Sequence, residues 1–395
     1  MKPDLFKAKA ADLHHQIIAW RRHIHANPEL SFQEFNTAAY VETMLGEMGI
    51  ASQRLAETGI VALVKGSSDN GRTIALRADM DALPITEANE VDYKSKIEGV
   101  MHACGHDVHT SCLLGAAYIL HETREHWKGE VKFIFQPGEE KLPGGASLMI
   151  NEGVLTNPAP EAIIGQHVMP FIETGKAGFR SGIYMASTDE IYLTIKGKGG
   201  HGAMPHLNID PVAISAQLIT ALQQVISRNA NPTVPSVLSF GKVIANGATN
   251  VIPDQVYMEG TFRTMDENWR ARAHECIKEI VNSVCSMYGA TAVLEIRKGY
   301  PVLNNDEVLT THARKVAVEY LGQENIVDLD LWMAAEDFAF YSHKIPACFY
   351  RLGTGNKEKG ITSSVHTPTF NIDENALPIG AGLMAWMAVS FLERP

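Results

Sequence analysis

Residues 73–81 read TIALRADMD, a short β-prone run at 73–76 that is closely followed by two acidic residues, Asp79 and Asp81. Apolar or β-branched runs of the same kind occur at 59–64, 131–135 and 162–164. Helical patterns separate these runs, notably at 110–127 and 146–155. Strands that alternate with helices predict an α/β fold built on a sheet with parallel strands.

The segment before this sheet is predicted to be helical. Residues 4–26 have the pattern of one amphipathic helix. Ser31 and Glu34 have the spacing of a capping box, and they predict a second helix that begins there and ends near Gly49.

The middle of the chain has a different order of elements. Strands are predicted at 191–195, 236–243, 255–263 and 291–296, with helices at 211–228 and 269–287. Two strand–helix–strand units in succession predict a ferredoxin-like sandwich. Helices at 306–321 and 376–392 then return to the first pattern. We therefore predict a larger domain formed by residues 1–186 and 298–395, and a smaller domain at 187–297 inserted into it.

Composition limits the possible functions. The 395 residues are 45% hydrophobic and 20% charged, as in ordinary globular proteins, and the net charge is −11. This negative charge argues against a nucleic-acid or anionic-membrane partner. The five cysteines are odd in number and irregularly spaced, which favours a reducing compartment over a disulfide framework. We expect a cytoplasmic protein that binds neither nucleic acid nor membrane.

Chemically active residues follow the predicted strands at their carboxyl ends. Asp79 and Asp81 follow the first strand, the pair Glu139-Glu140 follows 131–135, and His167 follows 162–164. Ligands of open α/β sheets bind beyond the carboxyl ends of the strands, so these residues predict one shared site.

A cysteine and a histidine in a predicted loop suggest that this site holds metal. Cys104 and His106 flank a glycine, and a late His366 could join them. Sulfur, imidazole and carboxylate together suit borderline metals such as zinc. The alternative is that Cys104 is a small buried hydrophobic residue.

The adjacent glutamates Glu139 and Glu140 suggest two different roles. Adjacent side chains diverge in extended backbone, so one of them could bind metal while the other faces an activated water. The alternative is that the pair forms a solvated acidic turn.

The motifs resemble the aminoacylase/carboxypeptidase family of dinuclear metal amidohydrolases, within it most closely the hippurate hydrolase and auxin-conjugate (IAA-amino acid) hydrolase branch. The matching segments lie in order along nearly the whole chain: RRHIHANPEL (21–30), LRADMDALP (76–84), HACGHD (102–107), QPGEE (136–140), GGHGAMP (199–205), NVIP (250–253), EDF (336–338) and VHTP (365–368). The resemblance implies a zinc-peptidase-like α/β catalytic domain with an inserted ferredoxin-like lid and dimerisation domain.

The resemblance also implies roles for the site residues. Cys104 would bridge two divalent metal ions (Zn²⁺ or Mn²⁺, with Co²⁺ or Ni²⁺ also compatible), and Glu139 would be the general base and acid. The remaining ligands would be His106 and His167 for one ion, and Glu140 and His366 for the other. Other branches carry a histidine ligand where this chain has Asp79. His106 would replace that ligand, and Asp81 would orient a ligand from outside the coordination sphere.

In the lid domain the resemblance points to His201, Asn250 and Arg263. Arg263 can hold a carboxylate through two hydrogen bonds, and His201 can stabilise an oxyanion. A surface ion pair for Arg263 and a turn position for His201 are the structural alternatives. The resemblance further implies a homodimer formed through the lid, with His201 serving the partner's site.

The predicted activity is hydrolysis of N-acyl amino acids (N-acetyl, N-benzoyl or similar) to a carboxylic acid and a free amino acid. A dipeptidase or carboxypeptidase on the same scaffold is the first alternative. A non-catalytic metal-binding protein would not need a spare carboxylate such as Glu139. A redox protein would need a reactive, metal-free thiol at Cys104.

Overall fold

The computed structural model describes residues 3–394, which form two compact units. The larger unit contains the described residues up to Tyr184, Asn304–Asp330, and those from Asp337 onward. The smaller unit contains Met185–Leu303 and Leu331–Glu336. No helix of residues 3–394 has the length and apolar character needed to cross a membrane.

The larger unit is built on an eight-stranded sheet with the order β1-β2-β4-β3-β5-β16-β6-β15. Its central strands run parallel to one another and are almost wholly buried: β4 (Glu130–Gln136), β3 (Thr73–Asp79), β5 (Ala162–Glu173) and β16 (Ala347–Gly355). The outer strands are β1 (Ser52–Leu55), β2 (Gly59–Lys65), β6 (Ala177–Phe179) and β15 (Ile326–Asp328). The predicted α/β fold with parallel strands is confirmed.

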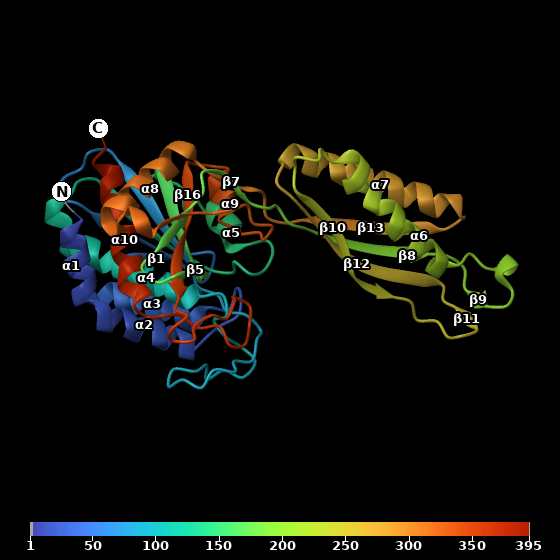
Figure 1. The fold of residues 1–395 in the computed structure, drawn as a ribbon, viewed down its shortest axis with the longest axis horizontal. Coiled ribbons are helices and arrows are strands. Elements are labelled where there is room, and N and C mark those ends of the chain that lie inside the picture. The colour runs from blue at the N-terminus through green and yellow to red at the C-terminus, as the bar shows by residue number, and fades with distance from the viewer. Residues whose placement is uncertain (1–2, 395) are drawn as a thin grey trace. The chain divides into compact units, whose positions relative to one another are not determined.

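Helices bury the apolar surface of this sheet. They are α1 (Asp4–Asp12), α2 (His14–Ala26), α3 (Phe35–Glu47), α4 (His106–Glu122), α5 (Gly145–Asn151), α8 (Glu307–Leu321), α9 (Ala339–Ser342) and α10 (Ala376–Leu392). Helices α4 and α10 are buried along most of their length and share one core with α1 and α2 (Figure 1). A Cβ at Gly115 would lie 2.8 Å from Cβ of Ala381, so glycine permits the close approach of α4 to α10.

The smaller unit is a ferredoxin-like sandwich. Its chain order is β8 (Asp189–Lys196), α6 (Pro211–Gln224), β10 (Ser236–Ile244), β12 (Gln255–Thr264), α7 (Glu267–Met287) and β13 (Thr291–Lys298). The antiparallel sheet has the order β10-β12-β8-β13, and α6 and α7 pack on one of its faces (Figure 1). This order of strands and helices is the predicted one.

Shorter elements complete the described chain. They are β7 (Gly182–Met185), β9 (Gly200–His201), β11 (Val251–Ile252), β14 (Leu303–Asn305), a π-helical turn (Val225–Asn229), and 3₁₀ turns at Arg124–His126, Pro205–Leu207 and Gln323–Asn325. Strands β9 and β11 pair with each other in a two-stranded sheet of the smaller unit.

Two predictions near the start of the chain were wrong. The single helix expected at 4–26 is divided at Leu13 into α1 and α2. The capping box of Ser31 and Glu34 does not form, since α3 begins at Phe35 and has no capping bond from the side chain of Glu34. The carboxylate of Glu29 takes that place and accepts hydrogen bonds from the backbone N–H groups of Asn36 (3.1 Å) and Thr37 (2.8 Å).

A buried ion pair joins three elements of the smaller unit and gives a test of its stability. Asp189, at the start of β8, accepts hydrogen bonds from Nε of Arg270 (2.9 Å), Nε2 of His274 (2.7 Å) and the backbone N–H of Gly299 (3.1 Å). Burial opposes ionisation, but the bonds from His274 and Arg270 outweigh it and lower the pKa of Asp189.

Asp189→Asn should therefore lower the free energy of unfolding by about 3 kcal/mol at pH 7, because it leaves the buried guanidinium of Arg270 with only the partly exposed Glu267, 3.1 Å from its Nη1, as counter-charge. A carboxylate with a lowered pKa stabilises the folded state above its unfolded pKa, near 3.9, and loses that contribution as pH falls through the folded value. Urea unfolding of both proteins should show the difference shrinking on acidification. Equal unfolding midpoints at pH 7 would contradict the expectation.

Candidate metal centre

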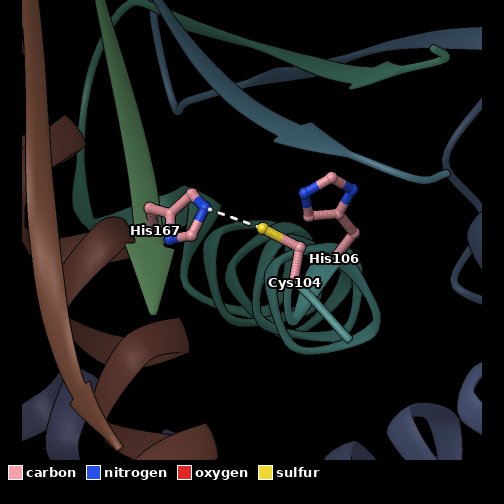
Figure 2. Close-up of side chains that lie close together, drawn as sticks. All are labelled: Cys104, His106 and His167. Carbon is pink, nitrogen blue, oxygen red and sulfur yellow. Dashed lines mark hydrogen bonds between the residues drawn. The ribbon is translucent and has the colours of Figure 1, made fainter. Parts of the chain in front are cut away.

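The loop before α4 brings a thiol and an imidazole together. Gly105 has a left-handed backbone (φ 83°) and forms the N-cap of α4, so the chain reverses between Cys104 and His106. A Cβ at Gly105 would lie 2.6 Å from Cγ2 of Val168, which leaves room only for glycine. Figure 2 shows the sulfur of Cys104 directed toward the ring of His167 on β5, with His106 beside it. The Sγ–Nε2 distance from Cys104 to His167 is 3.5 Å.

Cys104 also lies against a second pair of candidate ligands. Nε2 of His366 is 3.2 Å from Sγ of Cys104 and 3.2 Å from Oε1 of Glu140. His366 has a positive φ of 61°, which is uncommon outside glycine, and its N–H donates to the carbonyl of Ala103 (2.8 Å). The backbone bond next to Cys104 thus holds His366 in a conformation that directs its ring at the sulfur.

The structure brings all five predicted ligand residues together. Cys104 belongs to two sets of three, one with His106 and His167 and one with Glu140 and His366. Within each set the ligand atoms lie within 4.8 Å of one another. Glu139 belongs to neither of these two sets, and its Oε2 lies 4.0 Å from Nε2 of His106. It is close enough to His106 and Glu140, and to Glu336 and Asp337, to form further sets of three that lack the sulfur. This arrangement can hold two cations that share the sulfur.

Hydrogen bonds fix which ring nitrogen of two histidines is free. Nδ1 of His167 lies 2.8 Å from the carbonyl of Val168, and Nδ1 of His106 lies 3.1 Å from Oδ1 of Asp81. Carbonyl and carboxylate oxygens only accept, so in its neutral form each ring carries its proton on Nδ1 and presents a lone pair at Nε2. Nε2 of His106 is buried and has no hydrogen-bond partner among residues 3–394. Metal-binding histidines characteristically have such an outer partner and a free inner nitrogen.

The charges around the cluster also suit a cation. Burial opposes a charged ring, yet Asp79 and Asp81 raise the pKa of His106 to about 10. Burial, followed by Glu140 and Glu139, raises the pKa of the Cys104 thiol. Both shifts express an excess of negative charge in a buried place. A divalent ion would supply the opposite charge and would deprotonate a coordinating thiol, so the residues present fit a metal.

Asp79 has structural partners instead of an open coordination position. Its Oδ1 lies 2.6 Å from Nδ1 of His109, and its Oδ2 accepts from Nη1 of Arg77 at 2.7 Å. Nε2 of His109 accepts the backbone N–H of Val168 (2.8 Å), so both nitrogens of that ring are engaged. Although Asp79, His106 and His109 are close enough for a metal set, His109 has no lone pair left for one.

Asp81 contacts two of the candidate ligands. Its Oδ1 accepts from His106, and its Oδ2 accepts from the backbone N–H of Glu140 (3.0 Å) and from Oγ of Ser31 (2.6 Å). Asp81 thus contacts His106 and Glu140 through hydrogen bonds and is itself in none of the candidate ligand sets among residues 3–394.

Two predicted residues of the smaller unit lie side by side. His201 on β9 pairs with Val251 on β11, and the N–H of Gly202 donates to the carbonyl of Asn250 (2.8 Å). The N–H of Ala203 donates to Nδ1 of His201 (3.0 Å). A backbone N–H only donates, so the ring proton of His201 must be on Nε2, where it can be donated to a ligand. His201 and Asn250 are both exposed.

Arg263 is half-buried on β12 and lacks an acidic partner. Its Nη1 donates to the carbonyl of Met333 (3.1 Å), and burial lowers the pKa of its guanidinium. Within residues 3–394 it makes no ion pair. A partly desolvated arginine without an acidic partner retains hydrogen-bond donors for an anionic ligand. The structure therefore does not show the surface ion pair that was the alternative for Arg263.

The family model described as peptidase family M20/M25/M40 matches residues 75–389. The chain belongs to this family. An N-acyl-L-amino acid amidohydrolase of Geobacillus stearothermophilus is 45% identical over 293 residues, which cover 74% of this chain and 78% of the relative. Thermostable carboxypeptidase 2 of Saccharolobus solfataricus is 38% identical over 379 residues, 95% of each chain. A solved Bacillus subtilis structure, described as a dinuclear metal binding peptidase from the M20 family, has a TM-score of 0.83 and 37% identity, covering 97% of this chain and 99% of that one.

Membership in the M20 family confirms the predicted enzyme class, a metallo-amidohydrolase. The narrower assignment to the hippurate and auxin-conjugate branch stays a prediction. Several supporting residues of this M20 enzyme were not anticipated from its sequence, among them Arg77 and Glu34. Both are fully buried although charged, and no local pattern distinguishes them from exposed residues. The spacing of Glu34 from Ser31 even indicated a different role.

Proposed function

We propose that this M20-family enzyme hydrolyses the amide bond of N-acyl amino acids, such as N-acetyl or N-benzoyl derivatives, to a carboxylic acid and a free amino acid. The observation that carries the proposal is the position of Glu139. This buried carboxylate lies beside the two ligand sets that share Cys104, and it belongs to neither of them. A binding site alone has no need of this extra carboxylate. The name of the 45% identical relative supports the same substrate class.

Cys104 would hold one divalent cation with His106 and His167 and another with Glu140 and His366, and these cations would supply Lewis-acid activation of water when bound. Glu139 accepts a proton from the attacking water as the water oxygen bonds to the amide carbon. Glu139 then gives this proton to the leaving nitrogen as the carbon–nitrogen bond breaks. Zinc and manganese both suit the donor set, as do cobalt and nickel.

We assign the recognition of substrate to the smaller unit. Nε2–H of His201 is suited to donate to the oxyanion that develops on the amide oxygen. Asn250, which directly precedes the strand β11 that pairs with β9, would contact the same group. Arg263 would bind the carboxylate of the amino acid with its remaining guanidinium donors.

A dipeptidase or carboxypeptidase activity is the second candidate, and the 38% identical carboxypeptidase favours it. The two can be separated by comparing an N-acetyl amino acid with a dipeptide that has the same C-terminal residue and a free amine. Our proposal predicts the larger kcat/KM for the N-acetyl compound. A larger value for the dipeptide would support the second candidate.

The assignment of Arg263 predicts that substrates need a free carboxylate. Replacing that carboxylate with a primary amide removes a charge-assisted interaction of about 1.5–3 kcal/mol, so kcat/KM should fall roughly 10- to 150-fold. In Arg263→Ala the carboxylate and the amide should be hydrolysed with similar efficiency. If wild-type enzyme uses the two compounds equally, Arg263 does not bind the carboxylate.

We also propose that the enzyme is a homodimer formed through its smaller unit, in which His201 completes the partner's site. Co-expression of Glu139→Ala with His201→Ala tests this, since each homodimer has only defective sites. Random pairing makes half of the dimers mixed, and one site in each mixed dimer would be intact, so activity should recover to roughly a quarter of wild type. No recovery in mixed dimers isolated through two different tags would show that His201 acts within its own chain.

A further inference from the structure

The segment Ser31–Glu34 of the larger unit contacts the turn that carries Glu139 and Glu140. Glu34 is fully buried. Its Oε1 accepts the backbone N–H groups of Phe32 (2.9 Å) and Gly138 (2.8 Å), and its Oε2 accepts the hydroxyl of Thr58 (2.8 Å). One carboxylate therefore joins the segment before α3, the residue just before β2 and the residue immediately before Glu139.

Phe32 makes a second contact with the same turn. It has a positive φ of 66°, which is strained for a bulky residue and persists only where the surroundings impose it. Its ring occupies the place that a Cβ of Gly138 would need. Gly138 itself has a φ of 56°, so glycine is required there both for the backbone and for the ring of Phe32.

The other end of the segment reaches the far side of the carboxylate pair. Oγ of Ser31 donates to Oδ2 of Asp81 (2.6 Å), the oxygen that also accepts the N–H of Glu140. The backbone of the turn is thus held on both sides, at Gly138 by Glu34 and at Glu140 through Asp81.

Glu34 is costly to bury, which argues against a role in stability alone. No Lys, Arg or His forms an ion pair with it in the part of the chain that the structure describes. Burial, assisted by Asp81, raises its pKa to about 7. A buried carboxylate held only by neutral donors destabilises a fold more than an apolar side chain would, and such costs are commonly found where function requires them.

We propose that Glu34 is a positioning residue of the metal centre: through the N–H of Gly138 it sets the direction in which Glu139 and Glu140 leave the turn. Glu34 touches neither substrate nor metal. The inference rests on the proposed function for the role of Glu139, but its effect on Glu140 concerns metal affinity and does not depend on the substrate.

Glu34→Ala and Glu34→Gln form the test. Alanine removes all three bonds, whereas glutamine can accept both N–H groups at Oε1 and donate from Nε2 to the Thr58 hydroxyl. In competition with a chelator, Glu34→Ala should bind Zn²⁺ roughly 10- to 100-fold more weakly than wild type, the usual effect of losing an outer partner. At saturating Zn²⁺ its kcat on an N-acetyl amino acid should fall by about 10²-fold with little change in KM, as expected when a catalytic group is misplaced. Glu34→Gln should restore both values to within a few-fold.

Glu29→Ala is the matched control, because Glu29 lies two residues before this segment and caps α3 without contacting the turn. It should leave Zn²⁺ affinity and kcat unchanged. Should Glu34→Ala fail to fold, Glu34→Asp keeps the charge but withdraws the carboxylate by one methylene from the N–H of Gly138, and it should lower Zn²⁺ affinity and kcat by about 10-fold.

Wild-type Zn²⁺ affinity in folded Glu34→Ala, or in Glu34→Asp if the first variant does not fold, would overturn the proposal. So would a Glu34→Gln protein as impaired as Glu34→Ala, since that would mean that the charge, not the bonds, matters. If wild-type protein binds Zn²⁺ but does not hydrolyse N-acyl amino acids, the proposed function fails, and the affinity series still decides the role of Glu34.

Discussion

Glu139→Gln is expected to retain the metals and to lose nearly all turnover. The amide preserves the shape of the side chain but cannot accept a proton from water, and a positioned general base contributes typically 10²–10⁴-fold to the rate. Glu139 lies outside both ligand sets that contain Cys104, so its replacement should not release an ion. The measurement is kcat on an N-acetyl amino acid together with the metal content of the purified variant.

The control for this experiment is the adjacent carboxylate. Glu140→Gln should release metal, because Oε1 of Glu140 lies in a set with Cys104 and His366. If Glu139→Gln lost its metal and Glu140→Gln kept it, the two glutamates would have exchanged the roles assigned to them here.

Cys104→Ala should release at least one metal and abolish activity. The sulfur lies 3.5 Å from Nε2 of His167 and 3.2 Å from Nε2 of His366, so it is the one donor common to both sets. Removing a shared thiolate takes a ligand from both ions, and each is left with only two of its proposed protein donors. Metal analysis after extensive dialysis gives the result directly.

Cys112→Ala is the matched control for Cys104. Cys112 is also buried in the larger unit, but its thiol contacts the carbonyl of Leu377 and belongs to neither ligand set. This variant should keep the metals. Two tightly bound metals in Cys104→Ala would place the sulfur outside the coordination sphere of both.

The position of the site could be predicted because it follows from strand order. Asp79 ends β3 and Asp81 follows it, Glu139 and Glu140 follow β4, and His167 lies on β5. These strands are parallel neighbours in the sheet, so their carboxyl ends meet at one edge. Residue type and strand order were therefore enough to place these residues in one cluster, although β5 continues to Glu173, beyond the predicted end at 164, and His167 lies within it.

The residues that support the cluster could not be predicted, since their partners are distant in sequence. Glu34 bonds to Gly138, and Ser31 bonds to Asp81. A local pattern reports only local partners, so the spacing of Ser31 and Glu34 indicated a helix cap. The role of Asp79 was likewise undecided until its bonds to His109 and Arg77 were seen.

Hydrolysis of an N-acyl amino acid by metal-free and metal-reloaded protein tests the central claim most directly. The protein is stripped with a chelator until metal analysis shows none, then loaded separately with zinc, manganese, cobalt or nickel and assayed on a panel of N-acyl amino acids. We expect no hydrolysis by the stripped protein and restored hydrolysis with at least one of these ions. Full activity in protein shown to be free of metal, or none with any of the four ions, would contradict the account.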